Sequence, residues 1–332
     1  MTARRGKVVV ADFINDGLDI ERSIIGELAD ISALDAYSEE DLVNRIEDAD
    51  AVMLYHCIQI TERTIDRLQN CKLIVRCGVG VDNVDRKAAR ARGIPVANVP
   101  DYGTEEVADS AIGMALTLTR GIHFLNSRLR RGVYPWTFQQ ASPIHRLRGR
   151  VFGIIGLGRI GAAAASRAKA LGMRVLFYDP FLPDGYDKAL GIERVETLES
   201  LLSQTHVLSL HCPLTDDTRH IVNAKTLAQL PQGSFLVNTA RGGTVDPMAV
   251  VGALASGHLA GAALDVLVDE PPVEPSELLI AWRDPNHPAH DRLILNPHSA
   301  FYSEEGLNDM RIKGSQACRR ALEGLPLRNI VN

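Results

Sequence analysis

The chain has 332 residues, of which 45% are hydrophobic and 23% are charged, and its formal net charge at pH 7 is −5. These values are ordinary for a soluble globular protein, and the length is sufficient for two domains with separate cores. The negative net charge and the absence of a long basic run argue against a protein that binds nucleic-acid backbones or anionic membranes.

Residues 7–100 alternate short apolar segments with amphipathic ones. They predict strands at residues 8–11, 31–34, 51–55, 73–76 and 94–98, and helices at residues 20–28, 39–46, 61–68 and 85–92. Alternating strands and helices imply parallel pairing and a doubly wound sheet. Because this part has no complete nucleotide fingerprint, we expect it to hold the substrate.

A long helix is predicted next, beginning at Thr104, which can cap the helix and is followed by two acidic residues. The apolar-rich run extends to about Leu118, with an extension to Arg131 as the alternative, and we interpret the helix as a connector between domains. Residues 134–136 break the pattern, and residues 137–149 read as a loop. We interpret the basic residues around the end of this loop as solvated surface: Arg146, Arg148 and Arg150.

A glycine fingerprint then follows a predicted buried strand at residues 151–155. Gly156, Gly158 and Gly161 stand in the order G-x-G-x-x-G, and an alanine-rich run predicts a helix to about Leu171. The glycines allow a tight turn, close approach of the backbone to a pyrophosphate, and close packing of helix on strand. The helix N-terminus offers N–H groups and a positive dipole end to phosphates.

An acidic residue completes the fingerprint. Asp179 follows a predicted strand at residues 174–178 and lies 18 residues after the last glycine. Its carboxylate can accept hydrogen bonds from both ribose hydroxyls and would repel a 2′-phosphate. The context therefore predicts dinucleotide binding and favours NAD over NADP. The glycines alone would also fit an ordinary glycine-rich turn.

The alternation resumes beyond the fingerprint. It predicts helices at residues 198–202, 224–230, 247–255 and 303–322, and strands at residues 207–210, 234–238, 260–264 and 293–295. In open α/β sheets, ligands bind beyond the carboxyl ends of the strands. Arg241, Asp265 and His298 all lie just past such ends. Residues 269–290 are rich in proline and predict a surface loop.

Three side chains in this half suit hydride transfer to a 2-oxo acid. Arg241 can hold the substrate carboxylate and polarise the carbonyl group, because its guanidinium is planar, bidentate and permanently charged. His298 can give a proton to the forming alkoxide. Glu270 can orient the imidazole and favour its charged form.

Several segments resemble the D-isomer-specific 2-hydroxyacid dehydrogenases, over essentially the whole chain. They are residues 156–161, 211–215, 237–243, 261–266, 270–271 and 296–298. Residues 54–57, 75–83, 176–180 and 300–304 are most similar to the C-terminal-binding-protein branch. The resemblance implies an α/β protein of two doubly wound parallel-sheet domains. A Rossmann cofactor domain (residues 102–301) would be inserted into a flavodoxin-like substrate domain (residues 1–101 and 302–332).

The resemblance implies NAD as cofactor and the roles given above for Arg241, Glu270 and His298. It implies cofactor contacts from Val79, Val107, Ile155, Gly156, Leu157, Gly158, Arg159, Ile160, Gly161, Asp179, His211, Cys212, Pro213, Thr218, Thr239, Ala240, Arg241, Asp265, His298 and Ala300. We expect substrate contacts from Tyr55, His56, Arg76, Gly78, Val79, Arg241, His298 and Phe301. For His56, structural packing is an equal alternative, and His211 is alternatively only a strand-end residue beside the cofactor.

The partners and location follow from the same reading. Family members are usually homodimers joined through the cofactor domain, and no metal is expected because His287 and His290 lack a third ligand. The five cysteines are scattered and form no Cys-x-x-Cys pair, which favours reduced thiols. No apolar run approaches the length of a membrane span, and the N-terminal residues lack the pattern of a signal peptide. We therefore predict a cytoplasmic protein.

The expected function is hydride transfer between NAD(H) and a small D-2-hydroxy acid or 2-oxo acid. One alternative is an NAD(H)-sensing, corepressor-like binding module with little turnover, because the most similar branch includes corepressors. Another is oxidation of a different small anion, such as phosphite. Phe301 stands where that branch has tryptophan, so a substrate preference shaped by the tryptophan does not carry over. The sequence does not name the substrate.

Overall fold

The computed structural model describes residues 5–332, which form two compact units. One comprises residues 5–103 and Ser303–Asn332, and the other comprises Thr104–Tyr302. The division falls within two residues of the boundaries that the sequence suggested. Part of the segment on which we based the absence of a signal peptide, residues 1–4, lies outside the described residues.

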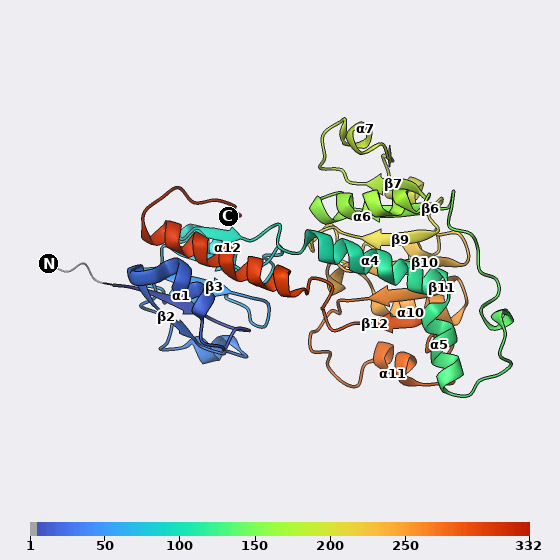
Figure 1. Cartoon of the computed structure of the whole chain (residues 1–332), viewed down its shortest axis with the longest axis horizontal. Coiled ribbons are helices and arrows are strands. Elements are labelled where there is room, and N and C mark those ends of the chain that lie inside the picture. Colours follow the sequence, from blue (N-terminus) through green and yellow to red (C-terminus); the bar gives the residue numbers. More distant parts are fainter. Residues whose placement is uncertain (1–4) are drawn as a thin grey trace. The chain divides into compact units, whose positions relative to one another are not determined.

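The first unit is built on a five-stranded parallel sheet with the order β2-β1-β3-β4-β5. Its strands are β1 (Gly6–Val10), β2 (Ala29–Ala33), β3 (Ala51–Leu54), β4 (Leu73–Arg76) and β5 (Val96–Asn98). Its helices are α1 (Asp19–Ile25), α2 (Glu62–Ile65), α3 (Arg86–Ala91) and α12 (Glu304–Leu322), with 3-10 turns η1 (Gly26–Leu28) and η2 (Glu39–Leu42). Helix α12 packs beside α1 and over β3 and β4 (Figure 1).

The second unit is built on a seven-stranded parallel sheet with the order β12-β11-β10-β9-β6-β7-β8. Its strands are β6 (Val151–Ile155), β7 (Arg174–Tyr178), β8 (Glu193–Arg194), β9 (Val207–Leu210), β10 (Ser234–Asn238), β11 (Leu259–Leu264) and β12 (Leu293–Leu295). Its helices are α4 (Thr104–Thr119), α5 (Ile122–Arg130), α6 (Arg159–Ala170), α7 (Tyr186–Leu190), α8 (Leu198–Leu202), α9 (Ala224–Leu227), α10 (Pro247–Ala255) and α11 (Glu277–Arg283), with 3-10 turns η3 (Phe138–Ala141) and η4 (Gly242–Thr244).

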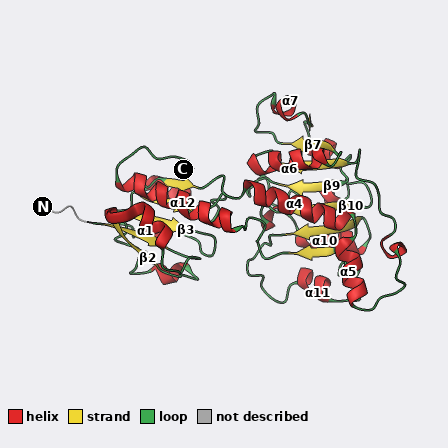
Figure 2. Ribbon diagram, in the orientation of Figure 1, coloured by secondary structure: helices red, strands yellow, loops and turns green. Residues whose placement is uncertain are grey.

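Both strand orders confirm the predicted fold class. The first unit has the flavodoxin-like order, and the second has the Rossmann order, in which the direction of winding reverses between β6 and β9. Strands β3, β4, β6 and β9 are buried along their whole length, which explains their nearly continuous apolar sequence. Figure 2 shows helices on both faces of the larger sheet.

The connector helix α4 ends at Thr119, close to the predicted end at Leu118, and Gly121, with a left-handed φ of 64°, excludes the alternative of one continuous helix to Arg131. Two local expectations were wrong. The predicted helix at residues 39–46 shortens to η2. The loop at residues 269–290 contains α11, which buries Leu278 and Leu279 on one side. Helix α7 and strand β8 were not expected at all.

A buried ion cluster ties α12 to α1 in the first unit. Arg311 is only 7% exposed, and its guanidinium donates two hydrogen bonds of 2.7 Å to Glu21, which is fully buried. It also donates to both oxygens of Asp16, at 2.7 and 2.9 Å. Bidentate pairing on both sides satisfies charges that would otherwise be costly to bury.

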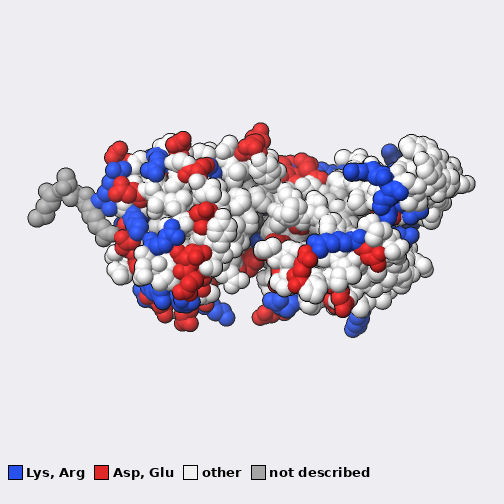
Figure 3. Space-filling model, turned by 90° about the horizontal axis from the view of Figure 1, so that it is seen from below, with Lys and Arg blue, Asp and Glu red and all other residues white. Residues whose placement is uncertain are grey.

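The molecular surface of the first unit carries mixed charge. On the face shown in Figure 3, acidic and basic side chains are interspersed over this unit and form no broad field of one sign. In the described part of the chain, no helix combines the length and the apolar character needed to cross a bilayer.

Candidate active site

The glycine fingerprint forms a cradle at the carboxyl end of β6. Gly156 has φ of 88°, and a Cβ atom placed there would lie 2.7 Å from the backbone nitrogen of Cys212. A Cβ on Gly161 would lie 2.3 Å from the carbonyl oxygen of Gly156. By contrast, a Cβ on Gly158, at the start of α6, would meet nothing within 4 Å. The fold therefore requires glycine at Gly156 and Gly161, whereas the space at Gly158 suits the approach of a ligand phosphate.

Asp179 is held beside this cradle. One of its oxygens accepts a hydrogen bond of 2.9 Å from the backbone of Leu157, and the other accepts one of 3.0 Å from Phe181. Each oxygen retains a lone pair for a ribose hydroxyl. At the end of β10, the hydroxyl of Thr239 is buried without a hydrogen-bond partner in the described residues. Together these groups fit a dinucleotide.

The segment after β9 supports the same edge. Cys212 is buried against Gly156, and the hydroxyl of Thr218 donates 2.6 Å to the carbonyl of Pro213, which shapes the turn. His211 instead bonds through Nε2 to the hydroxyl of Ser209 at 2.9 Å, and burial lowers its pKa to about 4. This geometry favours the alternative in which His211 is a neutral packing residue at the strand end.

Arg241 is fixed by a compact turn after β10. The side-chain amide of Asn238 and the hydroxyl of Thr244 donate to the Arg241 carbonyl at 2.9 and 2.6 Å. A Cβ on Gly242 would lie 1.9 Å from the backbone carbon of Leu267, so the loops after β10 and β11 touch directly. The turn therefore brings Arg241 next to the loop that carries Glu270.

His298 and Glu270 form the central pair of the site. The Nδ1 atom of His298 lies 2.6 Å from Oε2 of Glu270, and Oε1 of Glu270 accepts 2.8 Å from the backbone of Leu267. The His298 N–H donates 2.7 Å to the Asp265 carbonyl. The His298 backbone has φ of 52°, an uncommon conformation for a residue with a side chain.

Asp265 organises the turn that holds His298. Its carboxylate accepts hydrogen bonds from the backbone N–H groups of Ser299 and Ala300, at 3.0 to 3.1 Å. Asp265 is 1% exposed, and burial raises its pKa despite these bonds. This supports a structural task for its side chain, in addition to the predicted cofactor contact.

The electrostatics keep Glu270 ionised. Burial would raise the pKa of Glu270, but the hydrogen bond and charge of His298, the Leu267 N–H and the charge of Arg241 outweigh it, so the pKa lies below the usual value of 4.5. A carboxylate at neutral pH can accept a hydrogen bond from Nδ1–H and thereby leave Nε2 as the nitrogen that exchanges a proton with a substrate. The arrangement is suited to acid–base chemistry next to a fixed cation.

The remaining predicted residues of the second unit are mostly buried. Phe301 is 8% exposed, and its ring meets that of His298 edge to face at 6.1 Å. Val107 and Ala300 are also buried. Arg159 and Ile160 begin α6, Leu157 and Ile155 precede it, and Ala240 adjoins Arg241. The structure thus gathers Arg241, Glu270, His298, Asp265 and Phe301 at one edge of the larger sheet.

The predicted substrate residues of the first unit form a cluster of their own at the ends of β3 and β4. The Arg76 guanidinium occupies the space of a Gly78 Cβ, so any larger residue there would displace the guanidinium, and its Nη1 donates 3.3 Å to the Cys77 carbonyl. Val79 is 36% exposed. His56 packs against the ring of Phe13, with 4.6 Å between ring centroids.

Tyr55 has the most buried side chain of these predicted substrate residues. That side chain is fully buried, and burial raises its pKa well above 10. The Tyr55 side chain therefore packs in the core of the first unit, and its substrate contact stays a prediction. The backbone of Tyr55 is nevertheless important, because its N–H donates 2.6 Å to Asp12.

Sequence reasoning missed Asp12. This fully buried carboxylate follows β1 and accepts hydrogen bonds from the backbones of Tyr55 and Cys57, at 2.6 and 2.7 Å. Burial raises its pKa, and the Arg76 charge opposes that shift. Asp12 thus holds the loop that carries His56. An acid directly after an apolar strand was the signal that could have identified it.

Comparisons with known proteins identify relatives of the chain. The sequence model of the D-isomer specific 2-hydroxyacid dehydrogenase, NAD binding domain, matches residues 112–300. The chain is 36% identical to C-terminal-binding protein 1 of Caenorhabditis elegans over 93% of its length and 33% identical to D-3-phosphoglycerate dehydrogenase of Methanocaldococcus jannaschii over 98%. It spans only 42% and 59% of those two relatives, respectively.

A solved structure shares the whole fold. The D-lactate dehydrogenase of Aquifex aeolicus, complexed with NAD and lactic acid, superposes with a TM-score of 0.84 at 25% identity, covering 96% of both chains. The likeness thus extends over both units and includes the NAD-binding unit matched by the family model.

Proposed function

The chain belongs to the D-isomer specific 2-hydroxyacid dehydrogenase family, and from that premise we propose that it interconverts a small 2-oxo acid and its D-2-hydroxy acid with NAD(H). One observation carries the proposal. The 2.6 Å contact between His298 and Glu270 lies at the same sheet edge as Arg241, whose charge acts on Glu270. An imidazole, its carboxylate partner and a fixed cation are the groups that reduction of a 2-oxo acid requires.

Arg241 holds the substrate. Its guanidinium pairs with the substrate carboxylate and withdraws electron density from the adjoining carbonyl, while the hydrogen bonds of Asn238 and Thr244 to its backbone limit its movement. When bound, NADH supplies the hydride. Asp179 and the space at Gly158 hold the cofactor ribose and pyrophosphate.

His298 moves the proton. In reduction, Nε2 donates a proton to the forming alkoxide; in oxidation, the neutral ring removes it from the hydroxyl group. Glu270 fixes the tautomer by accepting from Nδ1 and stabilises the imidazolium form. Since reduction needs protonated His298 and oxidation needs the neutral ring, the two directions should show opposite pH preferences. The same preference in both directions would contradict this role.

We further propose a homodimer joined through the second unit. Between α5 and β6, Tyr134, Trp136 and Phe138 are 74%, 77% and 80% exposed, which is unusual for three aromatic residues in one segment. A second copy of the chain would bury them. Light scattering should give twice the chain mass for the wild type and less for Trp136→Asp. A monomeric wild type would refute the proposal.

We propose a cytoplasmic location on a separate ground. All five cysteines are free, and Cys77, Cys212 and Cys318 are buried as thiols. This usage is typical of a reducing compartment. Cell fractionation of the native host would test it, and recovery from an extracellular or oxidising compartment would contradict it.

The alternative of an NAD(H)-responsive binding module is supported by the 36% identity to C-terminal-binding protein 1. The two functions differ in turnover. A dehydrogenase consumes NADH with a preferred 2-oxo acid, whereas a binding module binds NADH tightly without consuming it.

A further inference from the structure

A cavity of about 550 Å³ lies at the opposite edge of the larger sheet. Val151, Phe235 and Arg292, at the amino ends of β6, β10 and β12, line it, together with residues 140–145 of the preceding segment. The candidate active site follows the carboxyl ends of the same strands. The cavity is therefore separate from the cofactor and substrate groups, and its volume is in the range of small-molecule sites.

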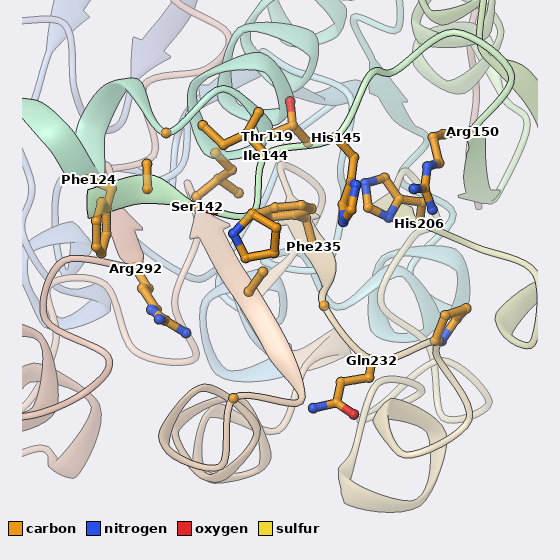
Figure 4. Close-up of a pocket in the computed structure, with 18 of the residues that line it drawn as sticks. Thr119, Phe124, Ser142, Ile144, His145, Arg150, His206, Gln232, Phe235 and Arg292 are labelled. Carbon is orange, nitrogen blue, oxygen red and sulfur yellow. The ribbon is translucent and has the colours of Figure 1, made fainter. Parts of the chain in front are cut away.

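Cationic and imidazole side chains occupy its two ends. At one end, the rings of His145 and His206 are 6.4 Å apart, with Arg150 beside His206 (Figure 4). At the other end, Arg292 lies 6.0 Å from the ring of Phe124. Among residues 5–332, neither Arg150 nor Arg292 has an ion-pair partner.

The one carboxylate that lines the cavity is already neutralised. Asp291 accepts 2.5 and 2.6 Å hydrogen bonds from Arg131 and 2.8 Å from the hydroxyl of Ser127, and Arg128 lies 3.5 Å away. The charge of the cavity is therefore positive, and its floor is apolar at Phe235.

The sequence shows the same bias. Between Asp109 and Asp179 there is no acidic residue, although this stretch contains 11 of the 36 Lys and Arg residues in a chain with 41 acidic ones. The stretch supplies Arg150 and His145 to the cavity. Arg150 is exposed, in agreement with the interpretation made from the sequence, and it also lines the cavity.

We propose that this cavity binds a small phosphate monoester, with the phosphate between Arg150, His145 and His206 and the organic part over Phe235. Arginine recognises phosphate through two parallel N–H donors, and each neutral imidazole can donate one more hydrogen bond. Phe235 already meets His206 edge to face at 5.5 Å, which fixes the imidazole against an apolar floor. The proposal does not depend on the reaction at the other edge.

Binding has a local signature. Burial, together with the nearby positive charge of Arg150, lowers the pKa of His206 to about 4. A bound dianion would oppose this charge and raise the His206 pKa. Histidine proton resonances of the full chain, titrated with inorganic phosphate and with phenyl phosphate, report this change separately from events at the cofactor site.

Arg150→Ala and Arg146→Ala remove the same charge, but only Arg150 lines the cavity. We expect saturable shifts of His206, an affinity at least about tenfold weaker in Arg150→Ala, and an affinity within about twofold of wild type in Arg146→Ala. Phenyl phosphate should bind more tightly than inorganic phosphate, because its ring covers Phe235. Absence of saturation, equal weakening by both variants, or no preference for phenyl phosphate would overturn the proposal.

Discussion

Glu270→Gln tests the pair on which the proposed chemistry depends. The substitution keeps the size of the side chain but replaces a charge-assisted hydrogen bond of 2.6 Å with a neutral one. Hydrogen bonds to charged groups contribute about 1.5–3 kcal/mol, and the Glu270 side chain is 35% exposed, so solvent screening reduces this contribution to about 1–2 kcal/mol. At about 1.4 kcal/mol per factor of ten, kcat for reduction should fall about 5- to 30-fold.

The assay is steady-state oxidation of NADH with the preferred 2-oxo acid, with Asp269→Asn as the matched control. Asp269 is the neighbouring acid, is exposed, and lies outside the hydrogen bonds of the site. Its kcat should stay within about twofold of wild type. If Glu270→Gln also stays within twofold while His298→Ala is inactive, then Glu270 is not the partner that the geometry indicates.

The His298–Glu270 pair should separate in acid. The pKa of Glu270 is lowered in the folded chain. The contribution of its charge to folding stability is therefore complete above the usual pKa of 4.5 and is lost as pH falls through the lowered pKa. Loss of the His298–Glu270 coupling, followed by the carboxyl resonance of Glu270, should therefore occur below pH 4.5. A midpoint above 4.5 would contradict the assignment.

Three further predictions concern the cofactor cradle and the first unit. Gly158→Ala should leave the melting temperature within about 2 °C of wild type but weaken NADH binding at least about tenfold, because the new Cβ fills space that the fold itself does not use. An unchanged calorimetric affinity for NADH would refute the assignment of Gly158 to the cofactor cradle. Asp179→Ala should raise the Kd for NADH about 10-fold, since the acceptor for the ribose hydroxyls is removed. NADPH binding should weaken less, since the charge that repels its 2′-phosphate is removed as well. Equal weakening of both cofactors would count against the predicted NAD preference. Arg311→Met should destabilise the first unit by about 3–5 kcal/mol in urea unfolding, because buried Glu21 loses its partner. As a control, Arg319→Met breaks an exposed pair and should cost about 0–1 kcal/mol. Equal costs would show that the cluster is not buried as described.

The core strands were predictable because burial on both faces leaves a nearly continuous apolar sequence. Strand β4 was predicted with its observed bounds, as were β6 and β7 on either side of the glycine fingerprint. The short elements at the surface were not. Helix α11 follows a proline-rich stretch, and its apolar residues 278–282 are consecutive and show no helical period, while β8 contains only two residues.

The site was predictable only as residue types at strand ends. Sequence order places His298 after β12, but the left-handed φ that directs it and the Asp265 bonds that hold its turn exist only in three dimensions. Tyr55 directly follows β3, and the continuous apolar sequence of that strand did not indicate that the Tyr55 side chain would be buried in the core. The cavity at the amino ends of the strands was invisible as well, because it joins Arg292 to residues more than 100 positions earlier.

The central claim is tested most directly by NADH oxidation at 340 nm with glyoxylate, hydroxypyruvate, pyruvate, phenylpyruvate and 4-methylthio-2-oxobutyrate. We expect one clearly preferred 2-oxo acid and a loss of turnover of at least about 100-fold in His298→Ala, since general acid catalysis contributes roughly that much. No turnover with any acid while NADH binds tightly, or turnover that survives His298→Ala, would contradict it.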